Sequence, residues 1–206
     1  MADTIQAIET FYDGYRFRSR LEARWAVFFN AAGIEYQYEP EGFDLEDIGY
    51  YLPDFYLPKF AAYVEIKPLS VIEEEERSAK EKLRRLFWGK DGIVVILLKG
   101  DPVDMQIQMY ANDANDSSGG EGWWNTEQDS MRFMMSVYEG LPDECGDPCI
   151  VYYNCHDHTL FRSDWYIAEW VFNSFACSNT FVPLKKAALK ARQARFEHGE
   201  TPEVRI

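Results

Sequence analysis

The sequence predicts an α/β protein with a mixed sheet, because its first hundred residues follow the order helix, three strands, helix, strand (αβββαβ). Two segments, 17–36 and 71–89, carry apolar residues at helical spacing. Short apolar runs bounded by proline or glycine indicate strands, most clearly at 61–66 and 92–100. The chain has 206 residues, 47% of them hydrophobic, which suffices for a full core. We expect one domain over residues 1–206, with a core at about 12–98, an acidic elaboration at about 101–182 and a basic C-terminal helix at about 183–198.

The first predicted helix has one apolar stripe, and Gly33 is placed to end it in a left-handed cap. Glu22 lies about one residue's rotation from that stripe, at the border between core and cleft. The stripe is formed by Phe17, Leu21, Trp25, Phe28 and Ala32.

The next elements follow in close succession. "IEYQYEP" predicts a short strand, "YYLPDFYLP" a strand or strand pair bounded by prolines, and "AAYVEIKP" a strand that Pro68 stops. The segment 71–89 predicts a second helix, acidic at its start and basic at its end as the helix dipole favours. "GIVVILLKG" predicts a buried strand.

After Gly100 the pattern weakens. The segment 110–129 has the composition of a surface loop. We then predict a strand at 148–154, an amphipathic helix at 163–175 and a basic helix at 183–199 with Pro183 in its first turn.

The net charge of −14 is unevenly distributed along the chain. Residues 101–182 hold 14 acidic and 2 basic side chains, and the rest of the chain holds 21 acidic and 19 basic ones. The basic residues outside the acidic segment form clusters, which leaves nucleic acid open as a partner. From this pattern we expect DNA contacts from Arg16, Arg18, Arg20, Lys185, Lys186, Lys190 and Arg192, although charge alone is equally consistent with solvated helix faces.

Several protein classes are disfavoured by composition. No apolar run is long enough for a membrane span, and the first residues lack the layout of a signal peptide. Four cysteines in such a chain do not suggest a disulfide framework. We expect a cytoplasmic protein without a membrane partner.

Two opposite charges interrupt the predicted strand at 61–66. Glu65 and Lys67 are two residues apart and therefore point to one face of that strand. Burying charges is costly unless they are paired or bind a metal. With Asp54 on the preceding strand they form an oxygen ligand set suited to magnesium, which the carbonyl of Ile66 and the carboxylate of Glu22 could complete. Such a site is suited to phosphodiester hydrolysis, in which Lys67 would orient the attacking water and offset negative charge in the transition state.

These residues resemble the motif of the PD-(D/E)XK nuclease superfamily. Pro53-Asp54 and Glu65-Ile66-Lys67 match its two motif segments, and Glu22 matches the acidic residue that many members have on the first helix. The resemblance covers roughly residues 12–98. The segments "FRSRLEARWAVFF" and "YLPDFYLP" are most similar to small bacterial and phage nucleases related to Holliday junction resolvases and transposon-end endonucleases.

The resemblance implies a restriction-endonuclease-like αβββαβ core and magnesium-dependent DNA cleavage that leaves 5′-phosphates, with manganese as a substitute. It implies metal binding by Asp54 and Glu65 and catalysis by Lys67, in the cytoplasm of a bacterial cell or phage-infected host. In many members a basic or polar residue of the second helix faces the site, and Lys80 is the candidate here. The expected catalytic set is therefore Glu22, Asp54, Glu65, Lys67 and Lys80, on substrates that include branched recombination intermediates.

Each assignment has a structural alternative. Glu65 and Lys67 would be ordinary on the solvated face of an edge strand, Glu22 could form a surface ion pair with Arg18, and Lys80 could lie on a solvated helix face. Trp123 and Trp124 could stack on unpaired bases or cover their own core. Zinc is the less favoured metal, because the spacing matches no standard structural site for the candidate ligands Cys145, Cys149, Cys155 and His158.

A rival function remains open at this stage. The chain could be a partner-dependent or non-catalytic subunit of a phage or bacterial recombination, packaging or defence complex. In that case residues 101–182 would bind a basic protein partner, and a homodimer is a further candidate assembly.

Overall fold

The computed structural model of this chain describes residues 8–112, 121–125, 132–135, 148–154, 159–162, 166–167 and 182–196. Its helices are α1 (Arg20–Ala31), α2 (Glu73–Gly89) and α5 (Val182–Gln193), with two short 3-10 turns, η1 (Glu46–Ile48) and η2 (Pro58–Phe60). The strands of the first hundred residues are β1 (Thr10–Tyr12), β2 (Tyr15–Phe17), β3 (Gln37–Tyr38), β4 (Phe43–Asp44), β5 (Tyr50–Tyr51), β6 (Phe55–Leu57), β7 (Ala62–Lys67) and β8 (Val94–Lys99). They are followed by β9 (Gln106–Asn112), β10 (Glu121–Asn125), β11 (Arg132–Met135), β12 (Pro148–Asn154), β13 (Thr159–Arg162) and β14 (Tyr166–Ile167).

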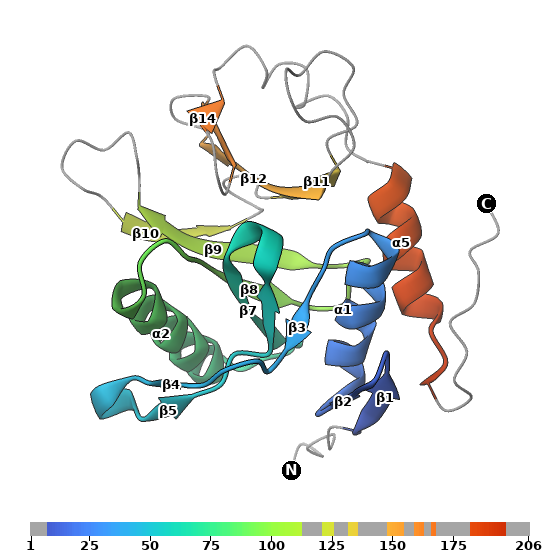
Figure 1. The fold of residues 1–206 in the computed structure, drawn as a ribbon, viewed down its shortest axis with the longest axis horizontal. Helices are drawn as coiled ribbons and strands as arrows, with labels where there is room; N and C mark the ends of the chain where they lie inside the picture. Colours follow the sequence, from blue (N-terminus) through green and yellow to red (C-terminus); the bar gives the residue numbers. More distant parts are fainter. Residues whose placement is uncertain are drawn as a thin grey trace.

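A six-stranded mixed sheet organises the molecule, in the order β10-β9-β8-β7-β6-β3 (Figure 1). The pair β7–β8 is parallel, and α2 is the crossover between these two strands. The pairs β3–β6, β6–β7, β8–β9 and β9–β10 are antiparallel. The predicted mixed α/β class is therefore confirmed. A second sheet has the order β11-β12-β13-β14, and β1–β2 and β4–β5 form separate two-stranded pairs.

One face of the sheet is covered by α1. Ser19 caps this helix, since its side chain accepts a hydrogen bond from the Glu22 N–H. At the other end Gly33 has a φ of +70°, the left-handed conformation predicted for the residue that stops the helix. Four residues of the predicted stripe are buried, whereas Leu21 is only partly buried. This face of the sheet and α1 together form the larger core.

The C-terminal helix α5 completes the same core. Ala187, Ala188, Ala191 and Ala194 are buried in one cluster with the apolar side chains of α1. Figure 1 shows α5 running beside α1. The small alanine side chains allow the two helices to approach closely, so residues distant in sequence share one core.

The opposite face of the sheet is covered by α2. Ala79, Leu83 and Leu86 of this helix are buried in a second cluster with Tyr63 of β7 and Leu97 of β8. Side chains alternate between the two clusters along β7, so the strand is buried on both faces.

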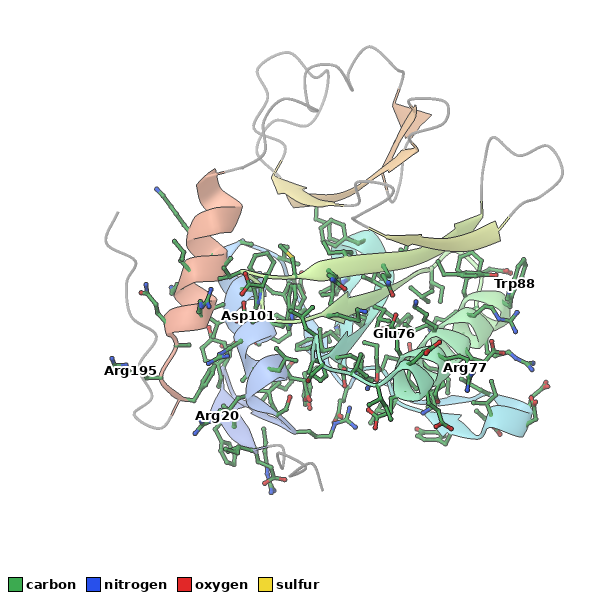
Figure 2. The ribbon with its side chains drawn as sticks, turned by 180° about the vertical axis from the view of Figure 1, so that it is seen from behind. Arg20, Glu76, Arg77, Trp88, Asp101 and Arg195 are labelled. Carbon is green, nitrogen blue, oxygen red and sulfur yellow. The ribbon has the colours of Figure 1, made fainter. Side chains whose placement is uncertain are left out.

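The helices α2 and α5, which both carry basic residues, therefore lie on different faces of the sheet. Figure 2 shows Glu76 and Arg77 on α2, away from Arg20 and Arg195 on the side of the molecule formed by α1 and α5. The basic residues of α2 and those of α5 therefore do not share one face of the sheet.

The region after Gly100 differs in part from expectation. Trp123 and Trp124 belong to β10 and pair with β9, so the prediction of a surface loop at 110–129 is wrong for these strands. The strand predicted at 148–154 is confirmed as β12. Tyr166–Ile167 is a strand, which contradicts the predicted helix at that point, and the rest of that helix lies outside the described residues. In the described part of the chain, no helix is long and apolar enough to cross a membrane.

Candidate functional site

Three predicted site residues lie at one end of two neighbouring strands. Glu65 and Lys67 belong to β7, and Asp54 directly precedes β6. The two strands are antiparallel with Phe55 opposite Val64, so Asp54 and Glu65 occupy the next position along the pair. The fold therefore brings together the charges that the sequence separates by eleven positions.

These charges are buried in an interior strand. β7 lies between β6 and β8, and only 4% of Asp54 and 7% of Glu65 are exposed. The alternative that Glu65 and Lys67 lie on the solvated face of an edge strand is therefore wrong. Buried charges need partners, and each of them has at least one.

Asp54 is held from two sides. Its Oδ2 accepts a hydrogen bond of 2.7 Å from the Ile66 N–H, which ties the side chain to β7. Its Oδ1 accepts a hydrogen bond of 2.6 Å from Nη2 of Arg18. Burial, and then the nearby carboxylates of Glu65 and Glu22, hold the pKa of Asp54 well above its usual range.

Glu65 joins Tyr51 and Lys67. Its Oε2 accepts a hydrogen bond of 2.9 Å from the Tyr51 hydroxyl, and its Oε1 accepts one of 2.7 Å from Lys67 Nζ. Burial and the charge of Glu65 raise the pKa of Tyr51, which stays a neutral donor. Burial opposes the charge of Lys67, but the charge and hydrogen bond of Glu65 together with the charge of Asp54 outweigh it, so that the pKa of Lys67 is raised. Lys67 is accordingly an ammonium at neutral pH.

Glu22 is buried and serves the start of α1. It accepts hydrogen bonds from the Ser19 hydroxyl at 2.6 Å, the Tyr38 hydroxyl at 2.6 Å and the Arg18 N–H at 3.1 Å. Only 8% of Glu22 is exposed, and its contact with Arg18 is to the backbone. The alternative of a surface ion pair with the Arg18 side chain is therefore wrong. Burial and the hydrogen bond to Glu22 raise the pKa of Tyr38, which keeps this hydroxyl a donor.

Lys80 forms an ion pair on α2. Its Nζ lies 2.8 Å from Oε1 of Glu76, whose Oε2 lies 2.7 Å from Nζ of Lys99. Lys99 is the register partner of Lys67 on the neighbouring parallel strand. Glu76 therefore links α2 to the strand beside the Glu65–Lys67 pair.

The donor set suits magnesium in its chemistry. All candidate ligands are oxygens, and the raised pKa of Asp54 reflects burial first and then repulsion by Glu65 and Glu22, which a divalent cation would offset. Magnesium is commonly held by one or two carboxylates with waters completing the shell, which Asp54 and Glu65 can provide. Among the described residues, no group of three or more His, Cys, Asp or Glu side chains is gathered closely enough to hold a metal. The predicted set that adds Glu22 to the two carboxylates is thus not assembled as one three-carboxylate group.

The expected DNA-contacting residues have different surroundings. Arg16 is exposed and pairs with Glu9, whereas Arg18 pairs with Asp54 and, at 2.7 Å, with Glu39. On α5, Lys186 and Arg192 are exposed, Lys190 is half-buried, and Arg192 lies 3.5 Å from a carboxylate oxygen of Asp104. The Lys185 side chain and the candidate zinc ligands Cys145, Cys155 and His158 lie outside the described residues, as does the Cys149 side chain on β12.

Sequence reasoning missed the residues that position the site. Tyr38, Tyr51 and Glu39 were assigned no role, although each contacts a predicted site residue or Arg18. The sequence did contain a signal for the contacts between Ser19 and Glu22, because serine followed by glutamate three residues later is the capping-box pattern. The contacts of Tyr51 and Glu39 depend on pairing between distant segments and have no such local pattern.

Comparison of the chain with protein-family models and with curated proteins finds no match.

Proposed function

We propose that this chain is a magnesium-dependent DNA endonuclease of the PD-(D/E)XK type. The observation that carries the proposal is the placement of Asp54, Glu65 and Lys67 at one end of the buried β6–β7 pair. Two carboxylates and an ammonium at such a buried position are unfavourable for stability alone, and groups of this kind are enriched at functional sites. The sequence order α1, β3, β6, β7, α2, β8, interrupted by the β4–β5 pair, is compatible with a restriction-endonuclease-like core.

In this proposal Asp54 and Glu65 would hold the cation, with the Ile66 carbonyl as a further candidate, whereas Glu22 serves the start of α1. A bound magnesium ion lowers the pKa of water and offsets the charge of the scissile phosphate. The chain itself contributes orientation. The Ile66 N–H fixes Asp54, and the Tyr51 hydroxyl fixes one oxygen of Glu65.

Lys67 supplies positive charge rather than a base. Its raised pKa keeps the ammonium protonated, and its hydrogen bond to Glu65 sets its direction. An ammonium at this place can donate a hydrogen bond to the attacking water or to a phosphate oxygen, and it stabilises the additional negative charge of the transition state. Lys80 acts at most through Glu76 in this scheme, because that carboxylate holds its ammonium.

A second candidate function is a DNA-binding subunit whose cleavage depends on a partner. The observation in its favour is that Arg18 and Lys67 already pair with the two carboxylates. Because both carboxylates already have a cationic partner, a further event would have to displace Arg18 or Lys67 before a metal cation could bind.

The test is a cleavage assay with magnesium on duplex, single-stranded, flap and four-way DNA. We expect cleavage by the wild type, loss of cleavage in Asp54→Asn, Glu65→Gln and Lys67→Ala, and retained folding by circular dichroism. Matched controls are Glu81→Gln on α2 and Lys90→Ala, since each removes a charge from an ion pair with partly exposed side chains outside the β6–β7 site. Cleavage at the wild-type rate by all three site variants would remove the assignment. Cleavage only after addition of a partner extract would favour the second candidate.

A further inference from the structure

Arg18 has a contact that the proposed function leaves unexplained. Its side chain is 56% exposed, yet its Nη2 reaches the buried carboxylate of Asp54 at 2.6 Å. Its Nε lies 2.7 Å from Oε1 of Glu39. An exposed arginine thus occupies an oxygen of the carboxylate that the proposed nuclease needs for its cation.

The backbone conformation of Glu39 supports a specific role for the contacts of Arg18 with Asp54 and Glu39. Glu39 has a φ of +46°, although it is not glycine and is followed by Pro40, and both features disfavour that conformation. The Glu39 N–H donates a hydrogen bond to the carbonyl of Asp54, which fixes this conformation next to the site. Strained backbone of this kind persists where the surrounding structure requires it, most often at functional sites.

The guanidinium and a divalent cation compete for the same oxygen. Each Asp54 oxygen accepts one hydrogen bond, Oδ2 from the Ile66 N–H of β7 and Oδ1 from the Arg18 side chain, so Oδ1 is the oxygen that a cation can take without disturbing the backbone of the sheet. Two positive groups on one oxygen repel each other, which means that cation binding releases the guanidinium from Asp54. The backbone N–H of Arg18 remains bound to Glu22 and the Tyr38 hydroxyl, so only the side chain has to move.

The released guanidinium has an evident use. Arg16 and Arg20 lie two residues away on either side and are the other basic residues of this segment. Arginine binds phosphate oxygens with two parallel hydrogen bonds, and the exposed half of the side chain gives it access to them.

We propose, building on the proposed nuclease function, that Arg18 exchanges Asp54 for a DNA phosphate when a divalent cation binds, so that cation and DNA favour each other's binding. This coupling is reciprocal by thermodynamic necessity. Carboxylate repulsion alone would also couple the two ligands, but it persists or increases when Arg18 is removed. The two causes therefore make opposite predictions for an Arg18 variant.

The experiment measures binding rather than cleavage. The Kd of one labelled duplex is determined by anisotropy with EDTA and with calcium, which we expect to bind without supporting efficient cleavage. In the wild type we expect calcium to lower the Kd by roughly 5- to 150-fold, the usual range of coupled binding. In Arg18→Gln this factor should fall to about 2 or less, and calcium should bind free Arg18→Gln with a smaller gain from added DNA.

Arg16→Gln is the matched control. Arg16 is a similarly exposed arginine that pairs with Glu9, a carboxylate outside the site. We expect this variant to weaken DNA binding by the same factor with and without calcium. If Arg18→Gln does not fold, Arg18→Lys decides, since a lysine ammonium lacks the two parallel N–H donors with which arginine binds a phosphate and should lower the coupling.

The outcomes separate this inference from the proposed function. A coupling factor in Arg18→Gln or Arg18→Lys equal to that of the wild type overturns the role of Arg18 and leaves the nuclease intact. Absence of any calcium or manganese binding that depends on Asp54 overturns both. Equal changes in the Arg16 and Arg18 variants would show a general loss of positive charge and would likewise overturn the exchange.

Discussion

Replacing Glu22 with alanine should destabilise the protein in the absence of any metal. The substitution removes the acceptor of three hydrogen bonds, from the Ser19 hydroxyl, the Tyr38 hydroxyl and the Arg18 N–H. Hydrogen bonds to a charged group contribute about 1.5–3 kcal/mol each, but they are not additive. One of the donors keeps a partner, because the Arg18 N–H also donates to the Tyr38 hydroxyl oxygen at 3.0 Å. The Ser19 hydroxyl loses its acceptor, although its oxygen still caps α1 by accepting the N–H of residue 22.

We therefore expect a loss of about 2–4 kcal/mol in the free energy of unfolding for Glu22→Ala. In a chain of this size, 1 kcal/mol corresponds to roughly 2–4 °C, so Tm should fall by roughly 5–15 °C. Glu22→Gln keeps one acceptor oxygen and should lose only about 1 kcal/mol. Thermal unfolding followed by circular dichroism in EDTA measures both values.

The control is Glu81→Ala on α2. Glu81 is 40% exposed and pairs with Arg84 and Arg85, and its replacement should cost no more than about 1 kcal/mol. Removing the Glu22 carboxylate also removes its repulsion of Asp54, which would raise stability, since Glu22 contributes to the raised pKa of Asp54. If Glu22→Ala melts at or above the temperature of the control variant in EDTA, the stabilising role of Glu22 at the start of α1 is refuted.

Three further predictions follow from other parts of the structure. Because the pKa of Asp54 is raised by burial and neighbouring carboxylates, its protonated form stabilises the fold below the unfolded pKa near 3.8, and this stability is lost as pH rises through the folded pKa. Asp54→Asn should therefore gain stability relative to the wild type in EDTA as pH rises from about 5 to about 8, and urea unfolding showing a constant or falling difference would contradict this. Trp25→Phe deletes a buried 2.9 Å hydrogen bond to the Gly100 carbonyl and should lower Tm by roughly 3–10 °C; an unchanged Tm would show that the bond contributes nothing. Lys190→Gln with Arg192→Gln should weaken DNA binding and reduce the slope of log K against log salt by about 0.9 per lost phosphate contact, whereas an unchanged slope would place α5 outside the DNA interface.

Local pattern predicted the elements around the site well. Apolar periodicity and the position of Gly33 identified α1, and the alternation at Glu65 and Lys67 placed both charges on one face of β7. These features depend on neighbours within a few residues. They are decided by backbone sterics and side-chain direction, which the sequence carries directly.

The partners of the charges were less predictable. Arg18 reaches Asp54 across 36 positions, and Tyr51 reaches Glu65 across 14, so both contacts depend on how β5, β6 and α1 are placed by the whole core. β10 was misassigned for a similar reason. Its strand conformation depends on pairing with β9, which outweighs the loop-like composition around Trp123 and Trp124.

The packing of α5 on α1 has a consequence for biosynthesis. Ala187 and Ala191 of α5 are buried in one cluster with apolar side chains of α1, although they are translated long after α1 itself. A nascent chain that has emerged as far as β10 can form the central sheet but still exposes this face of α1. Closing such a distant contact is entropically slow, so the final step of folding takes place after translation has passed α5. A chaperone that binds exposed helical faces would encounter α1 during this interval, and a nonsense mutation before α5 would leave the face open permanently.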